Sequence, residues 1–69
     1  MDTMNIIVNG KTTTVQSHTR VADLIMLLSL DNKRFAIEVN KELVLRSDFD
    51  TTHFQAGDKI EIIGAIGGG

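Results

Sequence analysis

Cysteine, proline, tryptophan and tyrosine are all absent from this sequence of 69 residues. Without cysteine the chain can form no disulfide, no cysteine-ligated zinc site, no CxxC redox pair and no thiol nucleophile. An excess of positive charge is missing too, because seven lysines and arginines stand against nine aspartates and glutamates, a formal net charge of −2. Nucleic-acid binding needs a basic face, so we expect no nucleic-acid partner.

Long apolar runs are also missing. No run approaches the roughly 20 residues that a membrane-spanning helix needs, and the N-terminus has no basic-then-apolar signal. We therefore expect no membrane partner and a cytoplasmic location. A chain of 69 residues builds one domain, and such a domain buries only about 60% of its unfolded surface. Because little room remains for a deep catalytic cavity, we predict that the chain is not an enzyme.

The first 16 residues predict a β-hairpin. Polar and apolar residues alternate from Met4 to Asn9, and Asn9-Gly10 is the dipeptide typical of a type I′ turn, whose two central residues both need positive φ. With this dipeptide as the loop, Val8 pairs with Lys11 and Met4 pairs with Val15. Directly opposed residues share a face, and this register gathers Met4 and Val8 with Val15 on one side.

The apolar period then changes to that of a helix. Val21, Leu24, Ile25 and Leu28 follow the i, i+3, i+4, i+7 spacing of one amphipathic stripe, and Thr19 is the expected N-cap. Leu30 lies off the stripe, and we expect it to fold back where the helix ends.

Three further strands and a short helical turn complete the pattern. Alternation over Phe35–Val39 predicts a strand, followed by a turn at Lys41-Glu42 and a short return strand over Leu43–Leu45. A helical turn capped by Ser47 follows, with Phe49 and Phe54 as its buried anchors. The final strand covers Lys59–Ile63, with Ile60 and Ile62 on the opposite face from Glu61 and Ile63.

These elements predict an α+β domain with the β-grasp fold. A single apolar stripe must cover one face of one sheet, so we expect a mixed four- to five-stranded sheet packed on one main helix. The first and last strands are expected to be adjacent and parallel. Residues 1–66 form the predicted domain, and residues 67–69 form a flexible glycine tail.

Conventional catalytic and metal-binding patterns are weak. Ser17-His18 with Asp23 has the residue types of a triad, but no nucleophile elbow or oxyanion glycine accompanies them. A calcium loop starting at Asp48 fails at its sixth position, which is His53 instead of glycine. We therefore expect no catalytic residue, no metal and no bound cofactor.

The glycine end is the feature with chemical potential. Gly67, Gly68 and Gly69 lack Cβ, so their backbone can enter a channel that side chains would block. Residues 66–69 extend roughly 13 Å. The α-carboxyl of Gly69 is ionised at neutral pH, because the ordinary pKa of such a group is about 3.3–3.7. The pattern favours a carboxylate that is presented to another protein's active site, although an inert frayed end is the alternative.

The whole chain resembles the ubiquitin-like sulfur carriers, and within them the ThiS family of thiamine biosynthesis. The resemblance rests on the opening Met4–Gly10, the helix Val21–Ile25, the segment Ala36–Asn40, Gly57-Asp58 before the last strand, and the Gly68-Gly69 end. It implies a β-grasp carrier whose partner, a ThiF-type enzyme, uses ATP and Mg²⁺ to adenylate Gly69. Sulfur from a sulfur-donor enzyme then gives a thiocarboxylate, which supplies thiazole synthase.

Partner docking and competing functions complete the sequence-based expectations. Ile7 and Ile63 point away from the helix in the expected registers, and Ile66 precedes the glycines, so these three are the candidate docking residues. The small subunit of molybdopterin synthase shares the predicted fold and thiocarboxylate chemistry. A ubiquitin-like protein modifier and an interaction module with an inert tail are two further possibilities.

Overall fold

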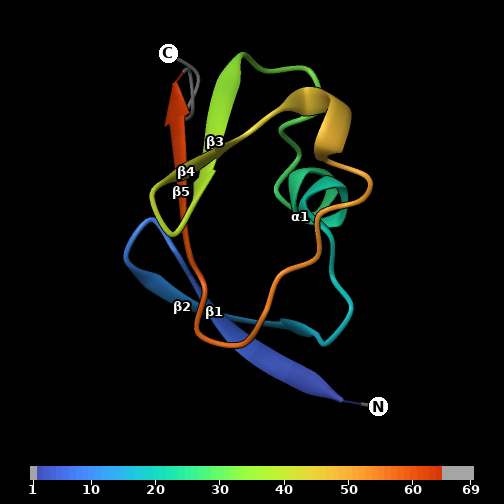
Figure 1. Cartoon of the computed structure of the whole chain (residues 1–69), viewed down its shortest axis with the longest axis vertical. Helices are drawn as coiled ribbons and strands as arrows, with labels where there is room; N and C mark the ends of the chain where they lie inside the picture. The colour runs from blue at the N-terminus through green and yellow to red at the C-terminus, as the bar shows by residue number, and fades with distance from the viewer. Residues whose placement is uncertain (1, 65–69) are drawn as a thin grey trace.

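The computed structural model describes residues 2–64, and these residues form a mixed five-stranded sheet with one α-helix (Figure 1). The sheet order is β2-β1-β5-β3-β4, in which β1 and β5 are parallel and every other neighbouring pair is antiparallel. This arrangement confirms the β-grasp prediction and the parallel first and last strands. The elements are β1 (Thr3–Val8), β2 (Lys11–Gln16), α1 (Val21–Leu27), β3 (Phe35–Val39), β4 (Glu42–Val44), the 3₁₀ turn η1 (Arg46–Asp48) and β5 (Lys59–Gly64).

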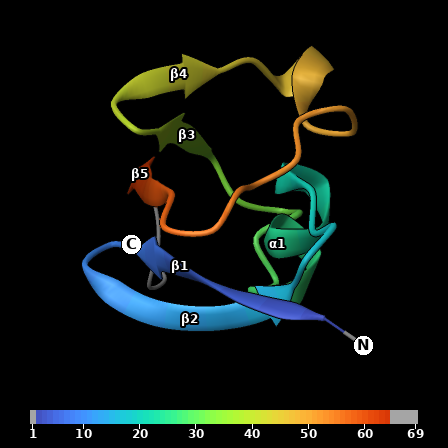
Figure 2. The same cartoon turned by 60° about the horizontal axis from the view of Figure 1, so that its bottom comes forward.

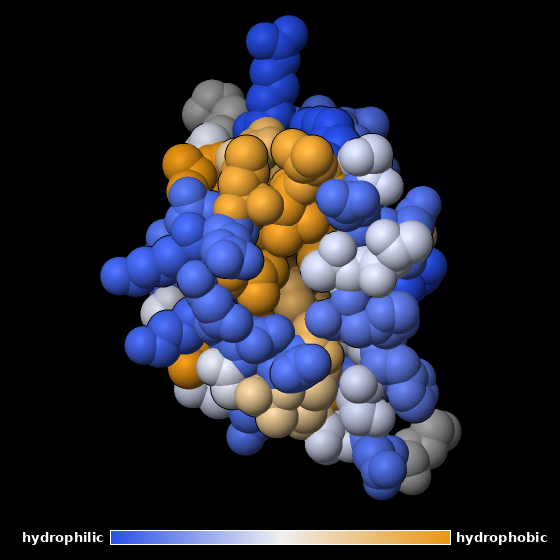
Figure 3. All heavy atoms as spheres, viewed as in Figure 1, coloured by the Kyte–Doolittle hydropathy of each residue, from blue (hydrophilic) through white to orange (hydrophobic). Residues whose placement is uncertain are grey.

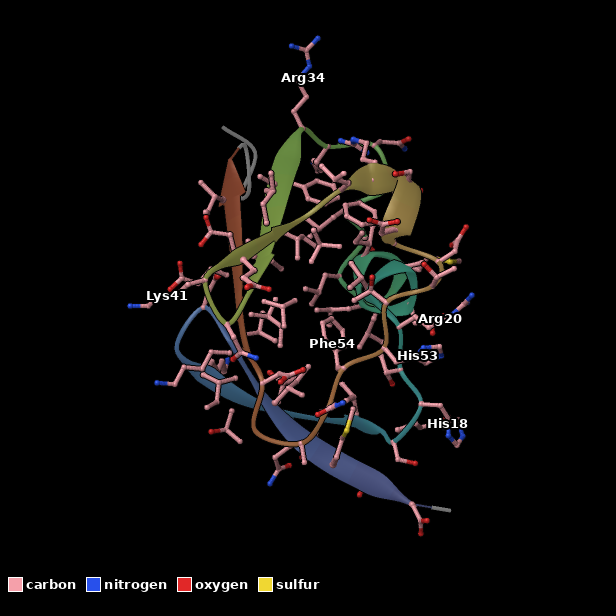
Figure 4. The ribbon with its side chains drawn as sticks, in the orientation of Figure 1. His18, Arg20, Arg34, Lys41, His53 and Phe54 are labelled. Atoms are coloured by element: carbon pink, nitrogen blue, oxygen red, sulfur yellow. The ribbon has the colours of Figure 1, made fainter. Side chains whose placement is uncertain are left out.

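The core lies between the sheet and α1. Figure 2 shows the helix on one side of the strands, with β5 between β1 and β3. Phe54 is a buried anchor as predicted and points into the space between sheet and helix (Figure 4). Phe49 is half-buried and stacks on Phe35. Within residues 2–64 no helix is long and apolar enough to cross a membrane. Five side chains are fully buried: Ile6, Val21, Leu24, Ile37 and Ile60.

The first hairpin has the predicted register. Val8 pairs with Lys11 and Met4 with Val15. The turn residues Asn9 and Gly10 have φ values of 49° and 82°, as a type I′ turn requires. The hairpin is therefore specified by local chemistry.

The N-terminus of α1 differs from the prediction, because Thr19 is not its cap. Arg20 occupies the N-cap position, and the Thr19 hydroxyl donates to the carbonyl of Gln16 at 2.7 Å. The first two helical N–H groups, on Val21 and Ala22, donate to backbone carbonyls of the segment 49–52 at 2.9 and 3.0 Å. A distant segment therefore satisfies donors that a local side chain was expected to satisfy.

The C-terminus of α1 closes in a Schellman motif. The N–H of Ser29 donates to Met26 and that of Leu30 to Ile25, at 3.1 and 2.9 Å. Leu30 folds back and is buried, as predicted. Leu28 lies just beyond the helix and is 41% exposed, so the expected stripe is shorter by one apolar residue. The motif places Ser29 at φ 57°, a conformation that suits glycine.

The second hairpin is shifted by one residue from the prediction. Its turn is Asn40-Lys41, with φ values of 52° and 71°, and Glu42 already belongs to β4. Leu45 is extended and is the N-cap of η1, so Ser47 lies inside the turn instead of capping it. The sequence pattern placed this turn one residue too late because neither turn residue is glycine. Only the positive φ angles in the structure show where the turn lies.

We predict that Ser29→Gly stabilises the domain. Glycine removes the Cβ strain of a left-handed residue but loses more backbone entropy on folding, for a net gain of about 0.5–1 kcal/mol. In a domain of this size the gain raises Tm by about 2–8 °C. Thermal unfolding followed by circular dichroism measures it. Ser29→Ala keeps the Cβ and is the matched control, for which no gain is expected; a Tm gain in both variants would contradict the strain.

Candidate functional site

The predicted tail lies outside the described residues. Ile66, Gly67, Gly68 and Gly69 all belong to residues 65–69, and the last described residue is Gly64 at the end of β5. The structure therefore describes the platform on which the tail begins. Figure 1 shows that β5 ends at the same end of the molecule where β3 begins, and Gly64 pairs there with Phe35. Arg34 extends outward at this end (Figure 4).

On its β1 side, the end of β5 is held by one side chain. Backbone pairing with β1 covers Ile7–Lys59 and Val8–Ile60 and then stops. Beyond it, the Asn9 side chain takes over: its Oδ1 accepts from the N–H of Ile62 at 2.8 Å, and its Nδ2 donates to the Ile62 carbonyl at 3.4 Å. The same residue that makes the hairpin turn thus extends the sheet by one step.

On its β3 side, the end of β5 depends on a missing side chain. Gly64 has φ 130°, and a Cβ added to it would lie 2.8 Å from the carbonyl oxygen of Arg34 and 2.9 Å from the Cα of Phe35. These contacts are with backbone, so β3 would have to shift to admit the Cβ of any L residue. Gly64 was not among the site residues predicted from the sequence; the signal available was a glycine at the end of a strand that contains three isoleucines.

The outer face of the sheet carries an exposed apolar surface beside the end of β5. Ile63 is 49% exposed, points away from the helix as predicted, and pairs with Ala36. Leu43 on β4 and Leu45, the extended residue just after it, are 61% and 57% exposed, and the alternation continued through Leu45 puts them on the same face. We call Ala36, Leu43, Leu45 and Ile63 the outer apolar patch. Figure 3 shows hydrophobic side chains gathered over β4 and near the end of β5.

Ile7 does not join the outer apolar patch. It is half-buried and pairs with Lys59, four residues before Ile63, which places the two isoleucines about 13 Å apart along the strand direction. The structure therefore brings Ile63 close to β4 residues that the sequence pattern did not single out. Between the two isoleucines, Glu38 and Glu61 lie directly opposite one another on the outer face. Like charges in that position disfavour the pair, and they make this part of the surface acidic.

The weak triad pattern is not assembled as one. The Ser17 hydroxyl and His18 Nδ1 are 3.5 Å apart, but Asp23 is bound to Arg20. Arg20 Nη2 lies 2.8 Å from Asp23 Oδ1, and the side-chain Nε and backbone N–H of Arg20 both donate to Oδ2. His18, Arg20 and His53 lie at the periphery in Figure 4. Among residues 2–64, no three His, Asp or Glu side chains are grouped to hold a metal.

The ion pair between Arg20 and Asp23 lowers the pKa of the Asp23 carboxyl. Hydrogen bonds from the Arg20 side chain, and then from its backbone N–H, lower the pKa of Asp23 from 3.8 to about 2. Both side chains remain partly exposed, at 39% and 41%. The carboxylate therefore stabilises the start of α1 in place of a conventional N-cap side chain.

Comparisons with known proteins agree on one family. The ThiS family model matches residues 3–69. The crystal structure of a thiamine biosynthesis protein (ThiS) from Geobacter metallireducens has a TM-score of 0.80 and 35% identity, covering 96% of this chain and 100% of that chain. Uncharacterized protein ycf40 of Porphyra purpurea is 32% identical over 66 residues, which cover 96% of this chain and 93% of that protein.

A thiazole synthase is also similar to this chain. The protein from Paramagnetospirillum magneticum is 33% identical over 66 residues, which cover 96% of this chain. The chain spans about a fifth of the length of the thiazole synthases that it matches.

We predict that Asp23→Asn removes one pH-dependent part of the stability. Because the folded pKa of Asp23 is below its unfolded value, its stabilisation is full above about pH 4 and is lost as the pH falls toward about 2. Asparagine still accepts the N–H of Arg20 but carries no charge. The variant is therefore less stable than the parent at pH 6, and the difference narrows by pH 2.

Urea unfolding at both pH values measures this difference, and NMR titration of the Asp23 carboxyl gives its midpoint directly. Asp31→Asn, an exposed aspartate beyond the helix, is the control. A midpoint for Asp23 near 3.8, the ordinary pKa of an aspartate, would contradict the ion pair.

Proposed function

Because the chain belongs to the ThiS family, as the resemblance of its sequence predicted, we propose that it is a sulfur carrier of thiamine biosynthesis and that the carboxylate of Gly69 carries the sulfur. The observation that carries this proposal is the family match over residues 3–69, which includes the glycine end. The fold supports it. The last strand, β5, is the central strand of the sheet and is held by a neighbour on each side, and its last residue, Gly64, comes directly before the C-terminal segment.

The chemistry begins with activation of a poor acyl donor. A carboxylate oxygen of Gly69 attacks the α-phosphorus of ATP in a ThiF-type partner, pyrophosphate leaves, and an acyl adenylate forms. Mg²⁺ in the partner neutralises the phosphate charge. Hydrosulfide supplied by the sulfur-donor enzyme then attacks the acyl carbon, AMP leaves as the C–O bond breaks, and loss of a proton gives a C-terminal thiocarboxylate. The chain itself supplies the terminal carboxylate and its placement, and it contains no thiol that could carry sulfur instead.

The acceptor is thiazole synthase. Relatives of that name contain a stretch similar to this chain within a longer protein, which supports a functional link between carrier and acceptor. The thiocarboxylate sulfur is nucleophilic and is carried at the end of a run of glycines. In the acceptor's active site it attacks an electrophilic carbon of the substrate and forms a thioester. Hydrolysis of the acyl–sulfur bond by water then leaves the sulfur on the substrate and restores the carboxylate of Gly69.

Docking to the activating partner uses the outer apolar patch. The patch lies on β3, β4 and β5, next to the last described residue of the chain, so a partner that covers it also meets the root of the tail. Glu38 and Glu61 border the patch and favour a partner surface that combines apolar side chains with basic ones. Ile66 stays a proposed contact next to the glycines, whereas Ile7 lies apart from the patch.

We predict that removing Gly69, or adding a residue after it, abolishes sulfur loading without changing Tm. The chain is incubated with the ThiF-type enzyme, ATP, Mg²⁺ and a sulfur source, and intact mass spectrometry follows the gain expected for replacing one oxygen by sulfur. A residue added before Met1 is the control. Loading of the shortened chain contradicts the role of Gly69, and adducts on other proteins indicate a modifier instead.

The same loaded chain distinguishes the two carrier functions. Delivery of its sulfur to molybdopterin synthase components, and not to thiazole synthase, assigns the chain to the molybdopterin pathway.

We predict that Ile63→Asp weakens binding to the activating enzyme at least tenfold. The substitution puts a charge in the outer apolar patch, at a side chain that is already half exposed and contributes little to the core. Leu27→Asp is the matched control, because Leu27 is 66% exposed on α1, away from that face. Isothermal titration calorimetry compares the two folded variants. Equal affinities, or a larger loss for Leu27→Asp, would remove the patch from the proposal.

A further inference from the structure

The end of β5 is held differently on its two sides. On the β1 side a side chain replaces strand pairing, whereas on the β3 side the strand pairing reaches Gly64, where the two backbones also pack closely. At the start of β5, the N–H of Ile7 donates to the carbonyl of Asp58, just before the strand, and the N–H of Asn9 donates to that of Ile60, both at 2.9 Å. Even-numbered residues of β5 thus present their backbone groups to β1. At Ile62 the backbone of β1 has already turned away, and the Asn9 amide replaces it.

Asn9 is suited to this replacement for two reasons. Its amide carries a donor and an acceptor, so it can bond the carbonyl and the N–H of Ile62 at once, as a strand backbone would. Its φ of 49° belongs to the type I′ turn, which an asparagine tolerates, and this backbone keeps the side chain over β5. The hairpin turn alone requires only a residue that accepts positive φ, so the amide is an additional feature.

Gly64 completes the arrangement from the other side. Because a Cβ at this position would lie only 2.8 Å from the Arg34 carbonyl oxygen, the beginning of β3 packs against the bare Cα of Gly64. The φ of 130° turns the chain at this residue in a way that L residues with a side chain rarely adopt. The strand is therefore bonded on one side at Ile62 and closely packed on the other at Gly64.

We propose that Asn9 and Gly64 form a clamp that fixes the position and direction of the chain at Gly64, the last described residue, and that both act as positioning residues in the activation of Gly69. The inference rests on the proposed function. A chain of five residues held extended in a partner's narrow channel spans about 16–18 Å. Over that length a change of about 20° in the direction at Gly64 displaces the far end by roughly 6 Å, well beyond the tolerance of a reacting geometry. When the domain has docked and the chain at Gly64 is fixed, the glycine tail begins at the entrance of the partner's channel. When the chain at Gly64 is free to move, insertion of the tail into the channel becomes the rate-limiting step.

Alanines of opposite chirality at position 64 can distinguish an effect on the placement of the chain end from an effect on the stability of the domain. Chains made by total chemical synthesis carry glycine, L-alanine or D-alanine at this position. D-alanine favours positive φ and projects its methyl from the opposite side of Cα, away from the Arg34 carbonyl, whereas L-alanine meets that carbonyl. Adenylation by the ThiF-type enzyme is measured at a temperature where all three chains are fully folded.

With L-alanine we expect kcat to fall at least tenfold with KM changed less than twofold, because the outer apolar patch still docks. With D-alanine we expect kcat within twofold of the glycine chain. Equal kcat for all three folded chains would reduce Gly64 to a structural residue, and equal losses with L- and D-alanine would remove the close contact with β3 as the cause.

Asn9→Gly tests the other half of the clamp. A Gly-Gly turn keeps the hairpin register but removes both bonds to Ile62, so we expect at least tenfold faster hydrogen exchange of the Ile62 N–H and a lower kcat. Asn9→Asp, which keeps the acceptor and loses the donor, should fall between. An unchanged rate of hydrogen exchange at the Ile62 N–H in Asn9→Gly overturns the clamp, whatever the enzyme assay gives. If the parent chain, with its natural Gly64, is never adenylated, the proposed function is overturned, but the exchange result is unaffected.

Discussion

The parallel contact between β1 and β5 is the constraint on which the other features of this structure depend. It joins Ile7 and Val8 to Lys59 and Ile60, residues about fifty positions apart, and so places the last strand in the middle of the sheet. Closing so long a loop costs conformational entropy that local contacts do not recover. Burial of Ile60 and Ile62 under the helix offsets that cost and holds the C-terminal strand between two neighbours.

In the proposed function the folded domain and the C-terminal end have separate roles, docking and chemistry. The sheet and α1 provide fixed surfaces, including the outer apolar patch, while the proposed chemistry belongs to a terminal carboxylate that needs no cavity of its own. Under the proposed function, 69 residues without cysteine can serve in sulfur transfer because a partner would supply ATP, Mg²⁺ and the catalytic groups. Selectivity would then depend on which partners fit the outer apolar patch and admit a run of glycines.

Three residues make local contacts that regular secondary structure does not supply. Asn9 makes a turn and extends the sheet at Ile62, and Gly64 ends a strand and admits the backbone of β3. Asp23 similarly bonds Arg20 at the start of α1, where a serine or threonine cap is more usual. The side chains of Asn9 and Asp23 satisfy backbone groups that regular secondary structure would leave open, and the missing side chain of Gly64 admits the close approach of β3.

Local chemistry in the sequence was sufficient for the element order, the first hairpin and the β-grasp fold, because alternation and the Asn9-Gly10 turn act between near neighbours. It also identified Gly69 as the candidate reactive end, which stays a prediction because Gly69 lies outside the described residues. Only the tertiary structure revealed the N-terminal contacts of α1 with segment 49–52, the bond from Asn9 to Ile62 and the need for glycine at position 64. These contacts join segments roughly 30 to 50 residues apart, and the spacing of residues along a chain carries no record of which distant backbone groups will meet.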